Sequence, residues 1–246
     1  MTSHAHQQQA YLLGSKLAYA KYASIWFPKT KKEVARDNAI RAANITSYAI
    51  PLASLGVAHA GHAVEQRYTP EAIRGNLEAS LRKAMNASPE LRVRYGTKPF
   101  GAYFNPSTNT VNVAHNPAPS IFAHEMGHAT GKPISNRLYG ASKILGPGTV
   151  PLSLLVQGFT DPDSPTATVA RYTPGVLGAP MLYEEARASL RGLKALHQIG
   201  GKGAVIRGLL PLLGAFGTYG ATAISPIVGG KILQHMMHQK KKVEHA

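Results

Sequence analysis

The sequence contains no cysteine, and both acidic and aromatic residues are few. Without cysteine the chain has no disulfide framework, no thiolate metal ligand and no thiol nucleophile. Any metal ion bound by its side chains must therefore be held by histidine and carboxylate groups. Charged residues make up only 16% of the chain. That share is well below the usual quarter, and it leaves room for long stretches without charge.

The few charges are strongly unbalanced, with 27 Lys and Arg against 12 Asp and Glu and a formal net charge of +15. Such a charge attracts polyanions, either nucleic acid or anionic lipid headgroups. No helix-turn-helix, RNA-binding or zinc-finger signature supports a specific nucleic-acid partner. The basic residues cluster beside uncharged stretches, which favours membrane lipid as the partner.

Three largely apolar stretches carry no Asp, Glu, Lys or Arg: Ala42–Val64, Ile144–Thr160 and Gly208–Gly230. Each is long enough to cross a membrane, which takes about 17–25 residues. Each contains Pro and Gly, which membrane helices tolerate better than soluble ones. The alternative is that they are buried helices and loops of a Gly-rich soluble domain, as the slightly negative mean hydropathy suggests. Their recurrence in one weakly charged chain favours a membrane-associated protein, with its orientation open.

Local patterns predict a small sheet between the first two of these stretches. Leu91–Tyr95 alternates like a half-buried strand. In residues 101–114, apolar pairs flank the turn-rich segment Asn105–Asn109, which predicts a β-hairpin. Thr69 followed by Pro70 and Glu71 is typical of a helix start, with Thr69 as the N-cap.

The segment His124-Glu125-Met126-Gly127-His128 is the strongest chemical motif of the chain. We expect it on a helix, with Ser120 as a possible N-cap. Residues four apart share one face of a helix, so His124 and His128 can present imidazoles to one zinc ion. Glu125 would then project beside the metal, where it can act as the general base of a peptide-hydrolysing site.

A catalytic zinc site needs a third protein ligand and one open position. The candidates downstream of the motif are carboxylates and four histidines, the carboxylates being Asp161, Asp163, Glu184, Glu185 and Glu244. The segment Tyr183–Leu196 is helical in character, and it places Glu185 and Ser189 one turn apart on one face. Glu185 can complete a two-His, one-Glu site, with Ser189 holding a ligand in place. Taken alone, Glu184 and Glu185 would be ordinary acids in the first turn of a helix.

A catalytic site of this kind also needs a group that stabilises the oxyanion of the tetrahedral intermediate. Tyr172, Tyr183 and His197 are the sequence candidates for that role, and the sequence does not choose among them.

The order of these elements resembles the YugP-type membrane proteases of bacteria, a family of neutral zinc metallopeptidases. The likeness covers roughly residues 90–230 and includes HEMGH, the hairpin before it, Glu185–Leu193, and the apolar segment Gly217–Ile224. It implies one Zn²⁺ ion held by His124, His128 and Glu185, with Glu125 catalytic. It also implies membrane helices around residues 144–160 and 208–230.

We therefore expect an α+β, mostly helical fold with zincin-like active-site helices, a small β-hairpin or sheet, and hydrophobic helices of membrane type. Residues 1–26 lack the features of a secretory signal and predict an amphipathic helix instead. The expected regions are a basic N-terminal helical region at 1–43, a hydrophobic helix at 44–66, a metallopeptidase core at 67–200 with the insertion 144–160, and a hydrophobic C-terminal helix with a basic tail at 201–246.

The expected function is a membrane-associated zinc endopeptidase that acts on protein or peptide substrates. The alternative is a non-catalytic protein that keeps a zincin scaffold as a structural subunit of a virion or a membrane complex. The high positive charge, the basic termini and the Gly- and Pro-rich apolar segments motivate that alternative.

Overall fold

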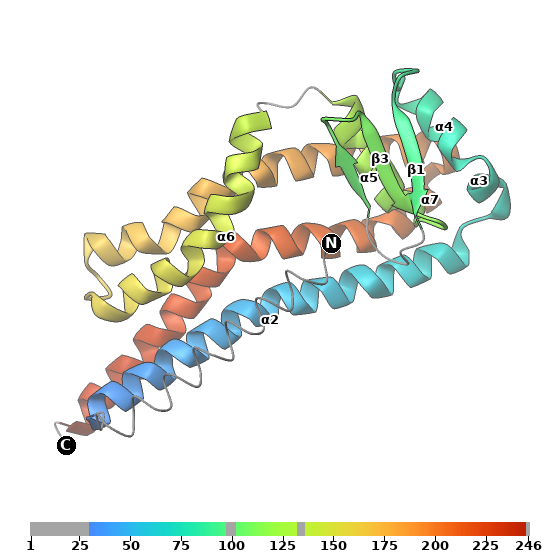
Figure 1. Cartoon of the computed structure of the whole chain (residues 1–246). Helices are drawn as coiled ribbons and strands as arrows, with labels where there is room; N and C mark the ends of the chain where they lie inside the picture. Colours follow the sequence, from blue (N-terminus) through green and yellow to red (C-terminus); the bar gives the residue numbers. More distant parts are fainter. Residues whose placement is uncertain (1–29, 97–101, 132–135, 245–246) are drawn as a thin grey trace.

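The computed structural model describes residues 30–96, 102–131 and 136–244 of the chain. Helices predominate, and one small sheet of three strands accompanies them. This confirms the α+β, mostly helical class. The structure is elongated, with α2 and α7 running along its length and the sheet gathered with the shorter helices at one end (Figure 1). The helix expected at residues 1–26 lies outside the described residues.

Helix α2 spans Lys31–Tyr68 and contains the whole of the first charge-free stretch. Its end is closed by Thr69, whose hydroxyl donates to the backbone carbonyl of Glu65 at 2.6 Å. The prediction that Thr69 caps the following helix is therefore wrong, because its hydroxyl bonds to the last turn of the preceding helix α2. Helix α3 (Glu71–Gly75) begins without a side-chain cap, and a break separates it from α4 (Leu77–Ala84).

The three strands are β1 (Arg92–Gly96), β2 (Tyr103–Asn105) and β3 (Thr110–Ala114). Strand β3 is central, parallel to β1 and antiparallel to β2. The strand and the hairpin predicted from the sequence are both confirmed. Alternation along β3 buries Val111 and Val113 on the face that packs against the helix carrying the His124–His128 motif.

Three helices complete the fold: α5 (Pro119–Thr130), α6 (Asn136–Phe159) and α7 (Pro165–Glu244). Helix α7 is interrupted at Gly200 and Gly201, and Gly201 has φ 64° and ψ −160°. L side chains rarely adopt that backbone conformation, so glycine is required there. The chain reverses at this point, and the first arm of α7 (residues 165–199) and its second arm (residues 202–244) run antiparallel (Figure 1).

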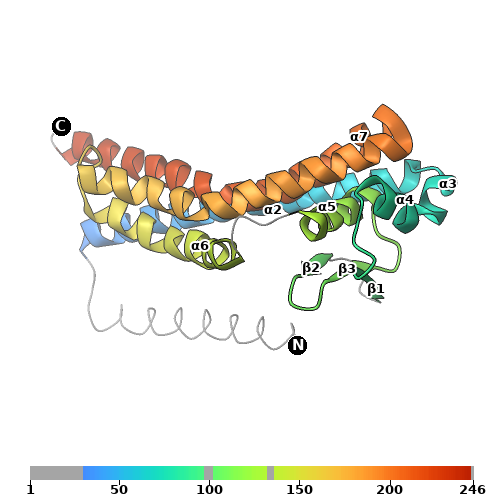
Figure 2. The same cartoon turned by 90° about the horizontal axis from the view of Figure 1, so that it is seen from above.

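Figure 2 shows α5 lying between the sheet and the long helices. The apolar face of α5 packs into the main core, together with α4, β3 and the first arm of α7. The largest fully buried side chains of this core are Phe122, Met126, Leu81 and Leu196. The sheet and the long helices thus hold α5 in place between them.

Among the described residues, one helical segment, Pro165–Ala221, is long and apolar enough to cross a membrane by length and composition alone. Most of its most apolar window is not buried inside the structure. Core helices of soluble proteins also meet this criterion, and the segment includes the break at Gly200 and Gly201. It is therefore a weak indication of a membrane location.

Candidate metal centre

Helix α5 carries His124, Glu125 and His128, and its first turn is anchored by a carboxylate from another helix. Ser120 lies inside α5, whose N-cap is Ala118, so the prediction that Ser120 is the N-cap is wrong. The backbone N–H of Ser120 donates to Glu65 Oε1 at 3.0 Å, and its hydroxyl donates to Glu65 Oε2. Glu65 is only 1% exposed, and burial raises its pKa to about 7 in spite of these hydrogen bonds. From its position on α2, the Glu65 carboxylate accepts hydrogen bonds from the first turn of α5 and so holds the N-terminal end of that helix.

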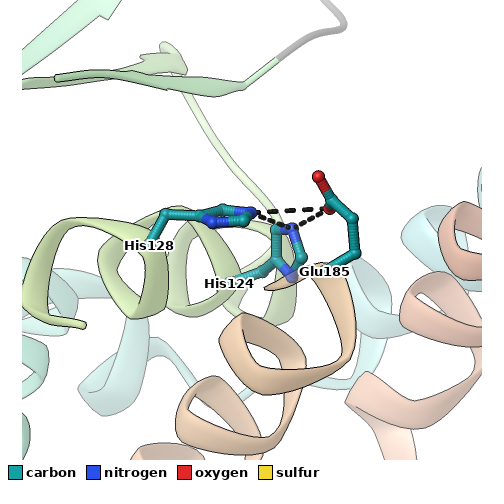
Figure 3. A group of neighbouring side chains, drawn as sticks. All are labelled: His124, His128 and Glu185. Atoms are coloured by element: carbon teal, nitrogen blue, oxygen red, sulfur yellow. Dashed lines mark hydrogen bonds and ion pairs between the residues drawn. The ribbon is translucent and has the colours of Figure 1, made fainter. Parts of the chain in front are cut away.

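His124 and His128 lie one turn apart on α5, and Glu185 reaches them from the first arm of α7 (Figure 3). His124 Nε2 is 3.1 Å from Glu185 Oε2, and His128 Nε2 is 3.4 Å from the same oxygen. The two Nε2 atoms are 3.2 Å apart. Three side chains predicted from the sequence to share one ion are therefore brought together, and they can hold a metal ion.

The spacing of these three atoms fits a small metal ion. Zinc binds imidazole nitrogen and carboxylate oxygen at about 2.0–2.2 Å, which places neighbouring ligand atoms of a tetrahedral ion about 3.3–3.6 Å apart. The observed separations of 3.1–3.4 Å agree to within a few tenths of an ångström. Two imidazoles and one carboxylate also suit other divalent transition metals, so the ligand set alone does not select zinc.

Among the described side chains, the other candidate carboxylates Asp161, Asp163 and Glu184 are not part of this group. Glu184 accepts a hydrogen bond from Arg187 at 3.1 Å. Asp161 lies in the connection between α6 and α7, where its side chain accepts the backbone N–H of Asp163. Glu185 is the carboxylate that faces both imidazoles, because it projects from the side of α7 that packs on α5.

Two hydroxyl groups form hydrogen bonds with the ligands His124 and Glu185, on atoms that face away from the metal position. Ser189 Oγ lies 3.0 Å from His124 Nδ1, which leaves Nε2 of that ring directed at the metal position. Tyr139 of α6 donates its hydroxyl proton to Glu185 Oε1 at 2.6 Å. Burial favours the neutral form of Glu185, but hydrogen bonds from both imidazoles and from Tyr139 outweigh it and hold the pKa well below its usual range. The group is therefore a preformed, anionic ligand.

Close packing of α5 on α7 lets Glu185 reach the two imidazoles. A Cβ at Gly127 would lie 2.4 Å from the carbonyl oxygen of Ala188, and a Cβ at Gly192 would lie 2.9 Å from the carbonyl carbon of Ala123. Both contacts are with backbone, so neither could be relieved by a side-chain rotation. Arg191 adds a hydrogen bond from its guanidinium to the carbonyl of Gly127 at 3.2 Å. Glycine on each helix therefore lets α5 and α7 approach at the level of the ligands.

Glu125 is partly buried beside the ligands and lines a cavity next to them. The backbone N–H of Phe104 in β2 donates to its Oε2 at 2.8 Å. Burial is the largest influence on its pKa, which is raised. The cavity has a volume of about 330 Å³. Its walls come from β2, α5, α6 and both arms of α7.

Two tyrosines of this cavity, Tyr139 and Tyr219, were missed by sequence reasoning. Neither is close to the motif along the chain, and no local pattern distinguishes either one. The tyrosines proposed from the sequence, Tyr172 and Tyr183, are about half exposed, and neither they nor His197 line this cavity. Lys143 also lines it, with its Nζ 3.9 Å from Glu185 Oε1.

Comparison with models of known protein families, with curated proteins and with solved structures finds no match. What the site can do must therefore be inferred from its own geometry.

Proposed function

We propose that this protein is a zinc-dependent peptidase associated with a membrane. The observation that carries the proposal is the convergence of His124, His128 and Glu185 beside a cavity that also contains the carboxylate of Glu125. Three protein ligands leave one position of a tetrahedral ion open, as catalytic zinc sites do. The likeness to YugP-type proteases at HEMGH and at Glu185–Leu193 supports the same assignment.

When bound, zinc supplies Lewis acidity, which polarises a carbonyl group and makes water a better proton donor at neutral pH. The remaining work falls to side chains of this chain. Glu125 takes the proton of the attacking water and later delivers a proton to the leaving amine. The N–H of Phe104 donates to Glu125 Oε2 and fixes the carboxylate, which lines the cavity. Tyr139 and Ser189 keep the ligands oriented during this cycle.

The proposal is tested with purified wild type and Glu125→Gln, each loaded with zinc and assayed for cleavage of casein and of a membrane-protein substrate. We expect the variant to keep its zinc and its helical content but to lose about 100-fold or more of its activity. Equal activity of the two proteins would refute the proposed role of Glu125.

The alternative is a non-catalytic structural subunit, for which the charge of +15 is the motivating observation. Zinc-free protein that folds normally, shows no hydrolysis and binds a defined lipid or protein partner would favour that alternative.

A further inference from the structure

The charge-free stretches of the sequence come together in the fold. Four helical segments without Asp, Glu, Lys or Arg lie alongside one another, mostly in the part of the molecule away from the sheet (Figure 1). We call them the charge-free belt: residues 42–64 of α2, 144–159 of α6, and 172–183 and 208–230 of α7. Residues 58–64 and 208–214 continue beside α5, where Gly208 approaches Ser120.

Close contacts fix how these segments are aligned. Gly214, on the second arm of α7, approaches the backbone of Ala58 on α2, and Gly175 on the first arm lies against Ala223 on the second. Gln157 of α6 donates its side-chain amide to a backbone carbonyl of the second arm at 3.2 Å. These contacts align residues 42–57 of α2, 144–159 of α6, and 172–183 and 215–230 of α7 at one level, where they form one slab. Residues 58–64 and 208–214 extend beyond this slab beside α5.

Charged residues mark both ends of this slab. Arg41 and Lys231 directly flank belt segments at the end farthest from the sheet, and Asp161 follows the α6 segment after Thr160. Gly158, Ile40 and Leu233 are in contact there, which places those three flanks at one level. At the opposite end, Lys143 precedes the α6 segment and Glu184 follows the first-arm segment of α7. Glu65 and Arg207, which flank the other two segments, lie beyond this level, beside Ser120.

The outer surface of the belt is apolar. More than half of each of the following residues is exposed, and each of the four segments contributes: Ile45, Leu52, Ile144, Leu152, Val176 and Leu213. A soluble monomer rarely presents a continuous apolar surface around a whole bundle. No belt residue carries a charge that would solvate that surface in water.

The belt helices also contain prolines and small-residue contacts that are typical of membrane helices. All seven prolines inside the described helices lie in the belt: Pro51, Pro147, Pro151, Pro174, Pro180, Pro211 and Pro226. A proline inside a helix costs about 3 kcal/mol or more in water, whereas membrane helices tolerate it. The contacts at Gly214 and Gly175 are those of small residues that let membrane helices approach closely.

The slab is somewhat thinner than the hydrocarbon core of a typical bilayer. Its α6 segment, residues 144–159, is about 24 Å long at 1.5 Å per residue, and its first-arm segment, residues 172–183, is about 18 Å long. The hydrocarbon core is about 30 Å thick, and a bilayer thins locally around shorter segments at modest cost.

We propose that the slab formed by residues 42–57, 144–159, 172–183 and 215–230 lies in a lipid bilayer and that the His124–His128–Glu185 site sits at the boundary between lipid and water on the side of the sheet. Glu185 follows the last belt residue of the first arm by two positions, and Lys143, the residue before the α6 segment, faces the same cavity. Resting on the proposed peptidase function, this position restricts the substrate class. The peptide bond that is cut lies within a few residues of a membrane surface, as in the segment of a membrane protein that emerges from the bilayer.

The first test measures depth and needs no turnover. Because the chain has no cysteine, single spin labels can be placed through Leu52→Cys, Leu152→Cys and Val176→Cys in the belt. Ser107→Cys and Glu90→Cys in the sheet region are matched exposed controls. In vesicles of phosphatidylcholine and phosphatidylglycerol, belt labels should collide with oxygen more often than with a water-soluble nickel chelate, and control labels should show the reverse.

Nickel access at the belt equal to that at the controls would overturn the proposal. So would a vesicle-free oligomer in which a second copy of the chain covers the belt labels. A belt in lipid without any hydrolysis would leave this placement intact and refute only the peptidase function.

The second test addresses the substrate class. One peptide sequence is anchored to vesicles through either a two-residue spacer or a 15-proline spacer, which is semi-rigid and about 45 Å long. We expect the short-spacer substrate to be cleaved at least tenfold faster. Equal rates, or a faster reaction with the long spacer, would contradict a site at the membrane surface.

Discussion

Gly127 of α5 and Ala188 of α7 touch through their backbones, since a Cβ at Gly127 would lie only 2.4 Å from the Ala188 carbonyl oxygen. Gly127 lies next to the ligand His128, and Ala188 lies between Glu185 and Ser189 in sequence. This one contact therefore sets the distance between the two imidazoles of α5 and the groups of α7 that complete the site.

Gly127→Ala should separate the two helices and weaken metal binding. The added methyl group meets backbone atoms that cannot rotate away, and such overpacking costs about 1–3 kcal/mol. Zinc affinity, measured by competition with a chromophoric chelator, should fall together with the Tm.

The matched control for this variant is Gly140→Ala on α6, where an added Cβ meets nothing within 4 Å. This change should keep the wild-type zinc affinity and slightly raise stability, because alanine is the better helix former. Zinc affinity of Gly127→Ala equal to that of the control would disprove the role of the helix contact.

Ser189→Ala should lower zinc affinity about 10- to 100-fold, the range found when a group that orients a metal ligand is removed. The hydroxyl lies 3.0 Å from His124 Nδ1 and fixes the ring orientation. Ser80→Ala on α4, outside the cavity lining, serves as the control. Zinc affinity within twofold of the wild type for Ser189→Ala would show that the contact is incidental.

Glu65→Gln should change how stability depends on pH. The pKa of Glu65 is raised from 4.5 to about 7 by burial, so the folded state holds a proton that the unfolded state releases. The stability contribution of Glu65 is therefore fully present below about pH 4.5 and is lost as the pH rises to about 7. At 1.36 kcal/mol per pKa unit, the loss is about 3 kcal/mol.

The measurement for this prediction is the free energy of unfolding of wild type and Glu65→Gln between pH 4.5 and pH 8. The difference, wild type minus variant, should fall by that amount up to pH 7 and stay constant above it. The exposed carboxylate Glu90 provides the control variant Glu90→Gln. A difference that does not vary with pH would contradict a buried, readily protonated Glu65.

The sequence was sufficient wherever chemistry and spacing are local. Imidazoles four residues apart on a helix predict a shared metal position. The apolar pairs on either side of the turn-rich segment Asn105–Asn109 predict the hairpin that β2 and β3 form. The same helical spacing places Glu185 and Ser189 on one face, which predicts Glu185 as the third ligand and Ser189 as the residue that orients a ligand. The structure brings all four of the proposed ligand and orienting groups together.

The remainder depends on tertiary contacts that leave no local pattern. Thr69 and Ser120 have the residue types of N-caps, but each forms its hydrogen bond with Glu65 in the assembled fold. Tyr139 and Tyr219 enter the cavity only because α6 and the second arm of α7 pass beside α5. The chain reversal at Gly201 could not be read from a sequence in which many glycines are present.

The central claim is that His124, His128 and Glu185 together bind one metal ion, and metal analysis of the purified protein tests it most directly. Wild type, His124→Ala and Glu185→Ala are saturated with zinc, dialysed against a weak chelator and analysed for metal per chain. The account predicts about one zinc ion in the wild type and strong loss in both variants. A wild type without zinc, or full occupancy in both variants, would contradict it.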